Sequence, residues 1–362
     1  MRNTFRNAKL FLLAGIVALA LAPGVLAQAS NWSVFATGFN NPRGLKFGPD
    51  GNLYVAEGGA GGTMSTVGTC KQVPSVGPYT GGFTGRISKV TPDGTVTTVA
   101  DKLPSDQTSA ASGSLVSGVA DVAFIGQTMY AILSGAGCSH GLAGTDNGVL
   151  RVNADGSTTM VADLSLFQKS HPVANFEPDD FEPDGTWFSM VAVGGALVAV
   201  EPNHGELDVI WPGGFISRIA DISSVEGHIV PTALAFDGAN FLVGNLDTFP
   251  IKGGSSKILQ ITPSGAISTV HIDLSDILGL AFDSKGRLYV LENTTGFAVP
   301  TPGTGRILRV DGKHTYTVIA KGLSLPTAMT FGPDGNLYVS NLGFGPPPVG
   351  AGQVVKVTVP SN

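Results

Sequence analysis

The sequence predicts an all-β chain that folds as a six-bladed β-propeller with four-stranded blades. Six units with the same order of apolar strands and glycine-containing turns follow one another, and repeats of this kind are typical of propellers. An isolated strand near the N-terminus matches the last strand of a unit. A charged fraction of only 13% together with 50 glycines favours short strands and tight turns over surface helices.

The first strand of the chain matches the far end of the sequence. Trp32–Pro42 aligns without a gap with Tyr316–Pro326, and the segments that follow, Pro42–Glu57 and Pro326–Asn341, share ten of sixteen residues. The chain stops after the third strand of its last unit, Gln353–Val357. We therefore expect the N-terminal strand to supply the missing fourth strand, because a borrowed strand closes a ring and removes an exposed sheet edge.

Each unit contains an apolar strand, a turn that is often Pro-Asp-Gly, a second apolar strand, a loop of variable length and two further strands. A β-sandwich is the alternative, but it predicts neither six equivalent units nor a displaced first strand. One candidate for a short helix is Ser165–Lys169. The third strands mark the units most clearly, and they start near Gly85, Gly148, Glu206, Lys257, Arg306 and Gln353.

Residues 1–27 have the pattern of a secretory signal peptide. Three basic residues lie within the first nine positions, Leu10–Leu21 is apolar, and Val25-Leu26-Ala27 is a cleavage signal. The alternative is a retained N-terminal anchor, although about twelve apolar residues are too few to span a bilayer stably. We expect a secreted or periplasmic protein with a single propeller domain over residues 28–362.

The net charge of the chain is −6, from 21 basic and 27 acidic residues. Loss of residues 1–27 removes three basic residues and no acidic one, which leaves −9. An acidic surface repels nucleic acid and anionic lipid but is compatible with cations. We expect a monomer with no nucleic-acid partner, no membrane span after signal cleavage, and a small-molecule ligand.

Cys70 and Cys138 are the only cysteines, so only one intramolecular pairing exists. They lie in equivalent loops of the first two units, and export permits a disulfide. The sequence therefore predicts a Cys70–Cys138 bridge that pins the largest loop. Two free thiols are the alternative.

The long loops of the units follow the second strand or precede the first strand. Because the strands are antiparallel, these loops should emerge on one face, and loops on a rigid scaffold are where sites are built. The long loops cover residues 58–84, 102–118, 164–186, 246–256 and 294–305.

Oxygen-bearing side chains end the second strand in five of the six units. A ring of such oxygens at the channel mouth suits a hard cation such as Ca²⁺, which takes six to eight oxygen ligands. The alternative is that these side chains cap exposed backbone groups. The predicted metal ligands are Glu57, Glu201, Asn245, Glu292 and Asn341.

The residues that open the first strands should surround the channel mouth, because the innermost strand of each blade lines the central channel. Ala120 and Leu278 occupy two of these six positions. The other four are our candidates for substrate binding: Arg43, Trp187, Thr232 and Thr327.

Two histidines flank the expected loop face in adjacent units. His204 follows Glu201 closely, and His228 precedes the first strand of the next unit. With Glu201 nearby, either histidine could act as a general acid or base. The alternative is that each one bonds to loop backbone, and His271 and His314 fit that structural role.

An acidic run, Glu177–Gly185, lies in one of the long loops. Asp180, Glu182, Asp184 and Gly185 resemble the opening of an EF-hand loop, but Val191 stands where the bidentate glutamate belongs. We interpret the run as a solvated acidic loop that ends in an Asp-Gly turn.

Seven short motifs of the chain are specific enough to suggest a family: Gly68–Cys70, Val76–Gly82, Gly137–Gly141, Phe181–Trp187, Glu201–Glu206, Gly227–Ala233 and Gly244–Leu246. In these motifs the chain resembles the ScyD/ScyE family, whose members are secreted six-bladed propellers. More distantly the chain resembles gluconolactonase-like and strictosidine-synthase-like propellers. That resemblance implies a divalent cation or a substrate held by Glu, Asn and Asp at the channel mouth.

Two functions fit these patterns. The first is a divalent-cation and small-molecule site at the channel mouth, with hydrolase or isomerase activity on a secondary metabolite. The second is a non-catalytic scaffold that binds a ligand or a protein outside the cytoplasm. No nucleophile elbow, phosphate-binding loop, zinc motif or dinucleotide fingerprint is present in the sequence.

Overall fold

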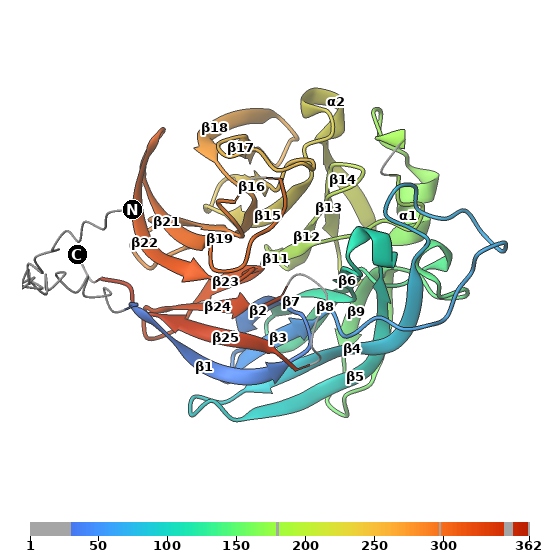
Figure 1. Cartoon of the computed structure of the whole chain (residues 1–362), viewed down its shortest axis with the longest axis horizontal. Helices are drawn as coiled ribbons and strands as arrows, with labels where there is room; N and C mark the ends of the chain where they lie inside the picture. Colours follow the sequence, from blue (N-terminus) through green and yellow to red (C-terminus); the bar gives the residue numbers. More distant parts are fainter. Residues whose placement is uncertain (1–29, 179–180, 297, 344–349, 361–362) are drawn as a thin grey trace, which may run out of the picture.

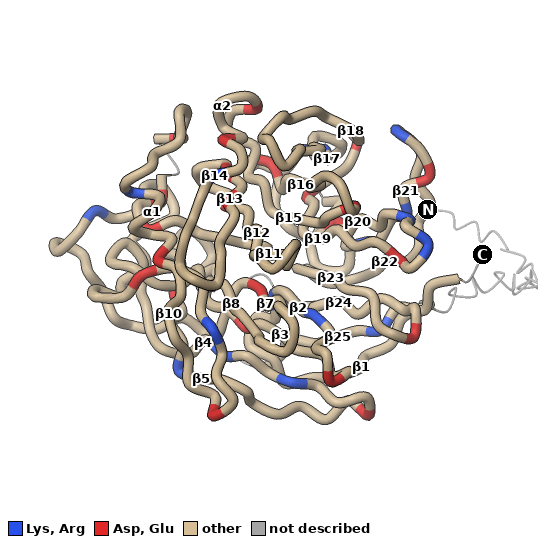
Figure 2. Tube along the Cα trace, turned by 180° about the vertical axis from the view of Figure 1, so that it is seen from behind, with Lys and Arg blue, Asp and Glu red and all other residues tan. Residues whose placement is uncertain are grey.

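The computed structural model describes residues 30–178, 181–296, 298–343 and 350–360. The predicted signal peptide lies outside the described residues. Six antiparallel sheets stand around a central axis like the blades of a propeller (Figure 1). Seen from behind, acidic and basic residues are interspersed along the chain (Figure 2).

The blades are described in their order around the ring, and the strands of each blade are given from the innermost to the outermost. Blade 1 is β2 (Pro42–Phe47), β3 (Leu53–Glu57), β4 (Thr80–Val90), β5 (Val96–Gln107) and the short β6 (Val116–Ser117); blade 2 is β7 (Val119–Ile125), β8 (Thr128–Leu133), β9 (Gly148–Val152) and β10 (Thr158–Asp163); blade 3 is β11 (Ser189–Val193), β12 (Ala196–Glu201), β13 (Glu206–Ile210) and β14 (Ile216–Asp221). Blade 4 is β15 (Pro231–Phe236), β16 (Phe241–Asn245), β17 (Ser256–Ile261) and β18 (Ile267–Leu274); blade 5 is β19 (Ile277–Phe282), β20 (Leu288–Glu292), β21 (Gly305–Gly312) and β22 (Thr315–Leu323); blade 6 is β23 (Ala328–Phe331), β24 (Leu337–Asn341), β25 (Gly352–Val357) and β1 (Trp32–Phe39).

Short helices lie in the loops. In the described parts of the chain they are the 3₁₀ turns η1 (Ala110–Ser112) and η2 (Cys138–His140) and the α-helices α1 (Leu164–Ser170) and α2 (Ser223–Glu226). The helix expected at Ser165–Lys169 is confirmed as α1, which begins where the Asp163 carboxylate accepts a hydrogen bond from the Leu166 amide at 2.8 Å. Among the described residues, none of the helices is long and apolar enough to cross a membrane.

The N-terminal strand closes the ring, as the sequence predicts. β1 pairs antiparallel with β25, so Trp32 lies opposite Val357 and Thr37 opposite Gln353. The Trp32 indole N–H also donates to the Lys321 carbonyl of blade 5 at 3.0 Å. Phe39 at the end of β1 is fully buried, so the borrowed strand is part of the core.

The apolar core is divided among the blade interfaces. The described residues form six clusters of buried side chains, and each cluster joins two neighbouring blades. The last cluster joins blade 6 to blade 1 through Phe39, Leu45 and Tyr338. The ring is therefore stabilised by burial of both faces of each sheet against its neighbours.

The repeated sequence of blades 1 and 6 makes the same local contacts. The Tyr54 hydroxyl donates to Asp50 at 3.0 Å, and the Tyr338 hydroxyl donates to Asp334 at 3.2 Å. Each aspartate also accepts the amide of the residue two positions on, Asn52 or Asn336, as turn aspartates do.

One boundary differs from the prediction and matters for the site. Residues 102–118 were expected as a loop, but β5 continues to Gln107, which pairs with Thr80 of β4. The longer β4–β5 hairpin brings Tyr79 and Asp106 to the face that carries the long loops. The extra pairing satisfies backbone groups that a loop would leave to water.

Candidate functional site

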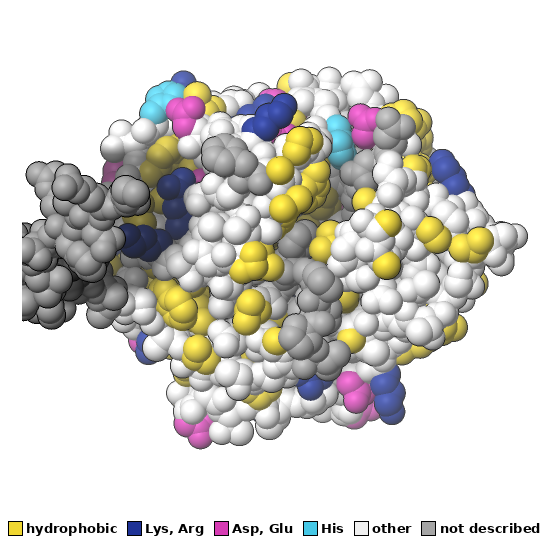
Figure 3. All heavy atoms as spheres, viewed as in Figure 1, with side chains coloured by type: hydrophobic (Ala, Val, Ile, Leu, Met, Phe, Trp, Pro, Cys, Tyr) yellow, Lys and Arg dark blue, Asp and Glu magenta, His cyan; other side chains and the backbone are white. Residues whose placement is uncertain are grey.

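A cavity of about 730 Å³ opens on the long-loop face. Its described wall comes from blades 1 to 4. Hydrophobic side chains lie around the middle of this face (Figure 3). Aromatic and aliphatic residues form much of the wall, with a small number of polar groups among them.

Three of the four predicted substrate-binding residues line this cavity. They are Arg43, Trp187 and Thr232. Arg43 and Thr232 lie at the starts of β2 and β15, and Trp187 lies two residues before β11. Thr327 of blade 6 is not in the described wall; it is buried, and its hydroxyl donates to the Pro42 carbonyl at 2.6 Å. Thr327 therefore joins two blades at the ring closure.

The five predicted metal ligands hold the backbone that enters or leaves their own blades. In each case an oxygen accepts a hydrogen bond from a nearby main-chain amide. The pairs are Glu57 with Asn40 at 2.7 Å, Glu201 with Thr186 at 2.8 Å, Asn245 with Lys257 at 2.7 Å, Glu292 with Ser275 at 2.8 Å and Asn341 with Ser324 at 2.8 Å.

Two of these five residues also form ion pairs. Glu57 pairs with Arg86 of β4 at 2.8 Å, and Glu292 pairs with Arg306 of β21. Within the described parts of the chain, no three His, Cys, Asp or Glu side chains form a group that could hold a metal. Calcium binding stays a prediction from the sequence, and we derive no step through it.

The two predicted catalytic histidines lie in different places. His228 lines the large cavity. His204 lines a smaller one of about 280 Å³, where its ring lies against Phe181 at a tilt of 34°, with 4.9 Å between ring centroids. The predicted pairing with Glu201 forms through the main chain, because the His204 amide donates to the Glu201 carboxylate at 2.6 Å.

His204 has a clear structural role. Its Nε2–H donates to the backbone carbonyl of Glu182 at 2.9 Å, which anchors the acidic loop. The interpretation of that loop as solvated is wrong for two of its carboxylates, because Glu182 is 4% and Asp184 only 2% exposed. Asp180 lies outside the described residues.

A buried row of four polar side chains beside the cavity was not predicted from the sequence. Asp106 contacts Nδ1 of His140, and Nε2 of His140 lies 3.5 Å from Oε2 of Glu182. The Tyr79 hydroxyl donates to Oε1 of Glu182 at 2.7 Å. All four side chains are buried, and Tyr79 and Glu182 line the cavity.

Opposite charges lie next to one another in this row of side chains and near Arg43. Burial lowers the pKa of His140, but the contacts with Asp106 and Glu182 outweigh it and raise the pKa to about 9. Burial lowers the pKa of Arg43 to about 10, an effect that the nearby Asp106 opposes. At neutral pH both His140 and Arg43 are therefore cationic.

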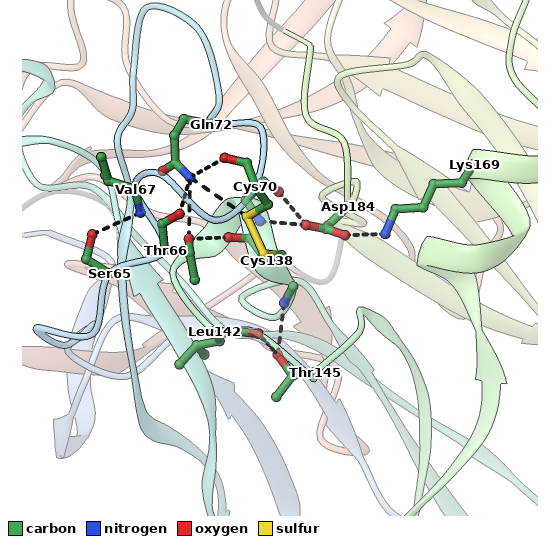
Figure 4. Close-up of a disulfide and its surroundings, with 12 residues drawn as sticks. Ser65, Thr66, Val67, Cys70, Gln72, Cys138, Leu142, Thr145, Lys169 and Asp184 are labelled. Atoms are coloured by element: carbon green, nitrogen blue, oxygen red, sulfur yellow. Dashed lines mark hydrogen bonds and ion pairs between the residues drawn. A yellow bond between two sulfur atoms is a disulfide. The ribbon is translucent and has the colours of Figure 1, made fainter.

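The disulfide lies next to this row of side chains, because Cys138 and His140 both belong to η2. Cys70 and Cys138 are bonded as predicted, and the bridge links the first long loop to η2 (Figure 4). Asp184 accepts hydrogen bonds from the Ser139 amide at 2.7 Å and from the Ser139 hydroxyl at 2.6 Å. Burial raises the pKa of Asp184, but bonds from Lys169 and Ser139 outweigh it and hold that pKa below its usual value.

The signal for the missed residues is visible in hindsight. His140 follows Cys138 within the segment Gly137–Gly141, and Glu182 belongs to the acidic run. Neither residue has a counterpart at the same position in the other units. A comparison of equivalent strand positions therefore does not predict them as site residues. Their contact depends on loops from different blades, which no single repeat encodes.

Comparison with known proteins supports the fold. No protein-family model matches the chain, and no curated protein matches it. A Bacteroides thetaiotaomicron protein of unknown function has a TM-score of 0.57 at 12% identity, over 92% of this chain and 76% of its own. A Xanthomonas campestris gluconolactonase has a TM-score of 0.54 at 12% identity, over 91% and 89%.

A luciferin-regenerating enzyme is also similar, with a TM-score of 0.52 at 12% identity over 90% of this chain and 93% of its own. At these identities the likeness shows a shared gluconolactonase-like propeller fold. The resemblance to the ScyD/ScyE family stays a prediction from the sequence motifs.

Proposed function

We propose that this protein is an exported hydrolase that binds a small, largely apolar organic molecule in the cavity on its long-loop face. The observation that carries the proposal is the cavity itself. A volume of about 730 Å³ falls in the range of roughly 300–1,000 Å³ that is usual for small-molecule sites.

The chemistry of the wall supports a ligand with an apolar body and few polar groups. Trp187 and Phe249 supply aromatic surface, while Arg43, Glu182 and His228 place polar groups on the same wall. This mixture of apolar surface and a few polar groups is typical of sites that orient one small molecule. A secondary metabolite fits this description.

Hydrolysis is favoured over isomerisation because gluconolactonase activity is named for a protein of this fold. Fold alone does not decide an activity. The cavity supports binding of a small molecule, and a measurement of turnover tests whether that molecule is hydrolysed. The alternative is a non-catalytic scaffold, which would bind a ligand in the same cavity without changing it.

The test measures hydrolysis of para-nitrophenyl butyrate and dihydrocoumarin by the mature protein and by a Phe249→Ala variant. Phe249 lines the cavity and is 52% exposed, so its removal should leave the fold intact. The loss of apolar contact should weaken the binding free energy by about 1.4 kcal/mol, which raises KM about tenfold.

The matched control is Phe215→Ala. Phe215 is 66% exposed in the β13–β14 turn, on the face opposite the cavity. Its loss should leave KM unchanged. Hydrolysis that is unaffected by Phe249→Ala would place the reaction elsewhere, and saturable binding of the probes without turnover would favour the scaffold.

A further inference from the structure

A line of alternating charges runs from the cavity wall into the loops. Arg43 lies close enough to Asp106 to interact with it electrostatically, Asp106 contacts His140, and His140 pairs with Glu182. Arg43 and Glu182 line the cavity at the two ends of this line. The four side chains are at most 8% exposed.

Such an arrangement is costly if its only role is to join loops. Each buried ion loses several kcal/mol of hydration free energy, and well-packed apolar side chains join loops at least as well. The disulfide already links the first long loop to η2 beside His140. Groups whose charge depends on burial and specific partners are common where acid–base chemistry takes place.

The carboxylate of Glu182 is held from two sides. Tyr79 donates to Oε1 at 2.7 Å, and the imidazolium of His140 lies 3.5 Å from Oε2. The backbone of Glu182 is fixed by the bond from His204 at 2.9 Å. A base with a fixed orientation at a cavity wall satisfies the first geometric requirement of general base catalysis.

We propose that Glu182 is the general base of this site, that Tyr79 and His140 are positioning residues for its carboxylate, and that the substrate is a carboxylic ester or lactone. The proposal rests on the proposed function, since it assigns the substrate class and the base for hydrolysis in the same cavity.

The reaction needs only water as a second reactant. Glu182 takes a proton from water while the water oxygen bonds to the carbonyl carbon, and the carbonyl π electrons move to oxygen to give a tetrahedral oxyanion. The carbonyl then re-forms, the bond to the alkoxy oxygen breaks, and the proton passes from Glu182 to that oxygen. One acid and one alcohol form, or one hydroxy acid from a lactone, and the carboxylate is regenerated.

The wall also selects the substrate class. Esters and lactones are uncharged and fit an apolar wall, whereas phosphate esters are anions. Glu177 and Asp247 line the cavity together with Glu182, and these carboxylates would repel an anionic substrate. Arg43 on the same wall supplies positive charge to a developing oxyanion.

The experiment compares Glu182→Gln and Tyr79→Phe with the wild-type protein on para-nitrophenyl butyrate and dihydrocoumarin. Glu182→Gln keeps the shape of the side chain but removes its basicity, so kcat should fall about 100- to 10,000-fold while KM changes little. The matched control is Glu226→Gln, because Glu226 of α2 pairs with Lys257 of β17 and lies outside the described cavity wall.

Tyr79→Phe gives a readout that a purely structural role would not change. A carboxylate that loses a hydrogen-bond donor takes up a proton more readily. The acid limb of the kcat/KM profile should therefore move to higher pH, with the alkaline plateau retained. The titratable groups Tyr79, His140 and His204 contact Glu182. Asp106 and Asp184 act electrostatically on His140, and Asp106 also acts on Arg43.

The outcomes separate the two proposals. Absence of turnover by the wild-type protein removes the proposed function. Turnover that Glu182→Gln retains removes the assignment of Glu182 alone. If Glu182→Gln does not fold, Tyr79→Phe still decides: an acid limb at the wild-type pH overturns the positioning role and with it the placement of the base.

Discussion

The buried charge of His140 makes a prediction about stability and pH. The ring lies between Asp106 and Glu182, and these contacts raise its pKa from 6.5 to about 9. The folded protein therefore binds one more proton at this site than the unfolded chain between those two pH values. Stability from this site is complete below pH 6.5 and is lost as the pH rises through about 9.

The size of the effect follows from the shift. A difference of this size between the folded and unfolded pKa corresponds to about 3 kcal/mol. His140→Gln removes the imidazolium at every pH and leaves two buried carboxylates without it. That variant should lose about 3–5 kcal/mol at neutral pH and should lack the part of the pH dependence that His140 causes.

Urea denaturation followed by tryptophan fluorescence measures both quantities across this pH range. His314→Gln is the control, because His314 pairs with Asp273 at the surface, where both side chains are about half exposed or more. Wild type and control should lose stability together as pH rises through 9. Parallel curves for the wild-type protein and His140→Gln would refute the assignment of a buried imidazolium.

Two further predictions concern the disulfide and calcium. The Cys70→Ala/Cys138→Ala variant should lose about 4 kcal/mol of unfolding free energy, as expected for a bridge that closes a loop of 68 residues. Reducing agent should lower the melting temperature of the wild-type protein toward that of the variant. An unchanged melting temperature of the wild-type protein would contradict this prediction. Millimolar calcium should leave the melting temperature unchanged, because the carboxylates of Glu57 and Glu292 are paired with arginines; a calcium-dependent rise that Glu201→Gln abolishes would restore the cation site predicted from the sequence.

Strand equivalence explains what could be predicted from the sequence. The repeat of Phe-Gly-Pro-Asp-Gly-Asn-Leu-Tyr-Val at both ends identifies β1 as the partner of β25. The same reasoning places Arg43, Trp187 and Thr232 at one cavity, because they lie at or just before the starts of equivalent innermost strands. Positions that repeat around a ring are fixed by backbone geometry, which the sequence pattern encodes.

The contacts of individual side chains could not be predicted in the same way. Strand position shows that Glu57 and Glu292 end equivalent strands, but not that each carboxylate turns toward a main-chain amide and an arginine. The contact between His140 and Glu182 joins segments that do not repeat. Such contacts depend on loop conformations that only the assembled blades determine.

A crystal structure with an uncharged lactam in place of the lactone, determined in the presence of calcium, tests the central claim most directly. We predict that the lactam occupies the cavity between Trp187 and Glu182, with its carbonyl carbon close enough to the Glu182 carboxylate for one water molecule to bridge them. A lactam bound outside the cavity, or held by a calcium ion on Glu57, Glu201 and Glu292, would contradict the proposed site and the proposed base together.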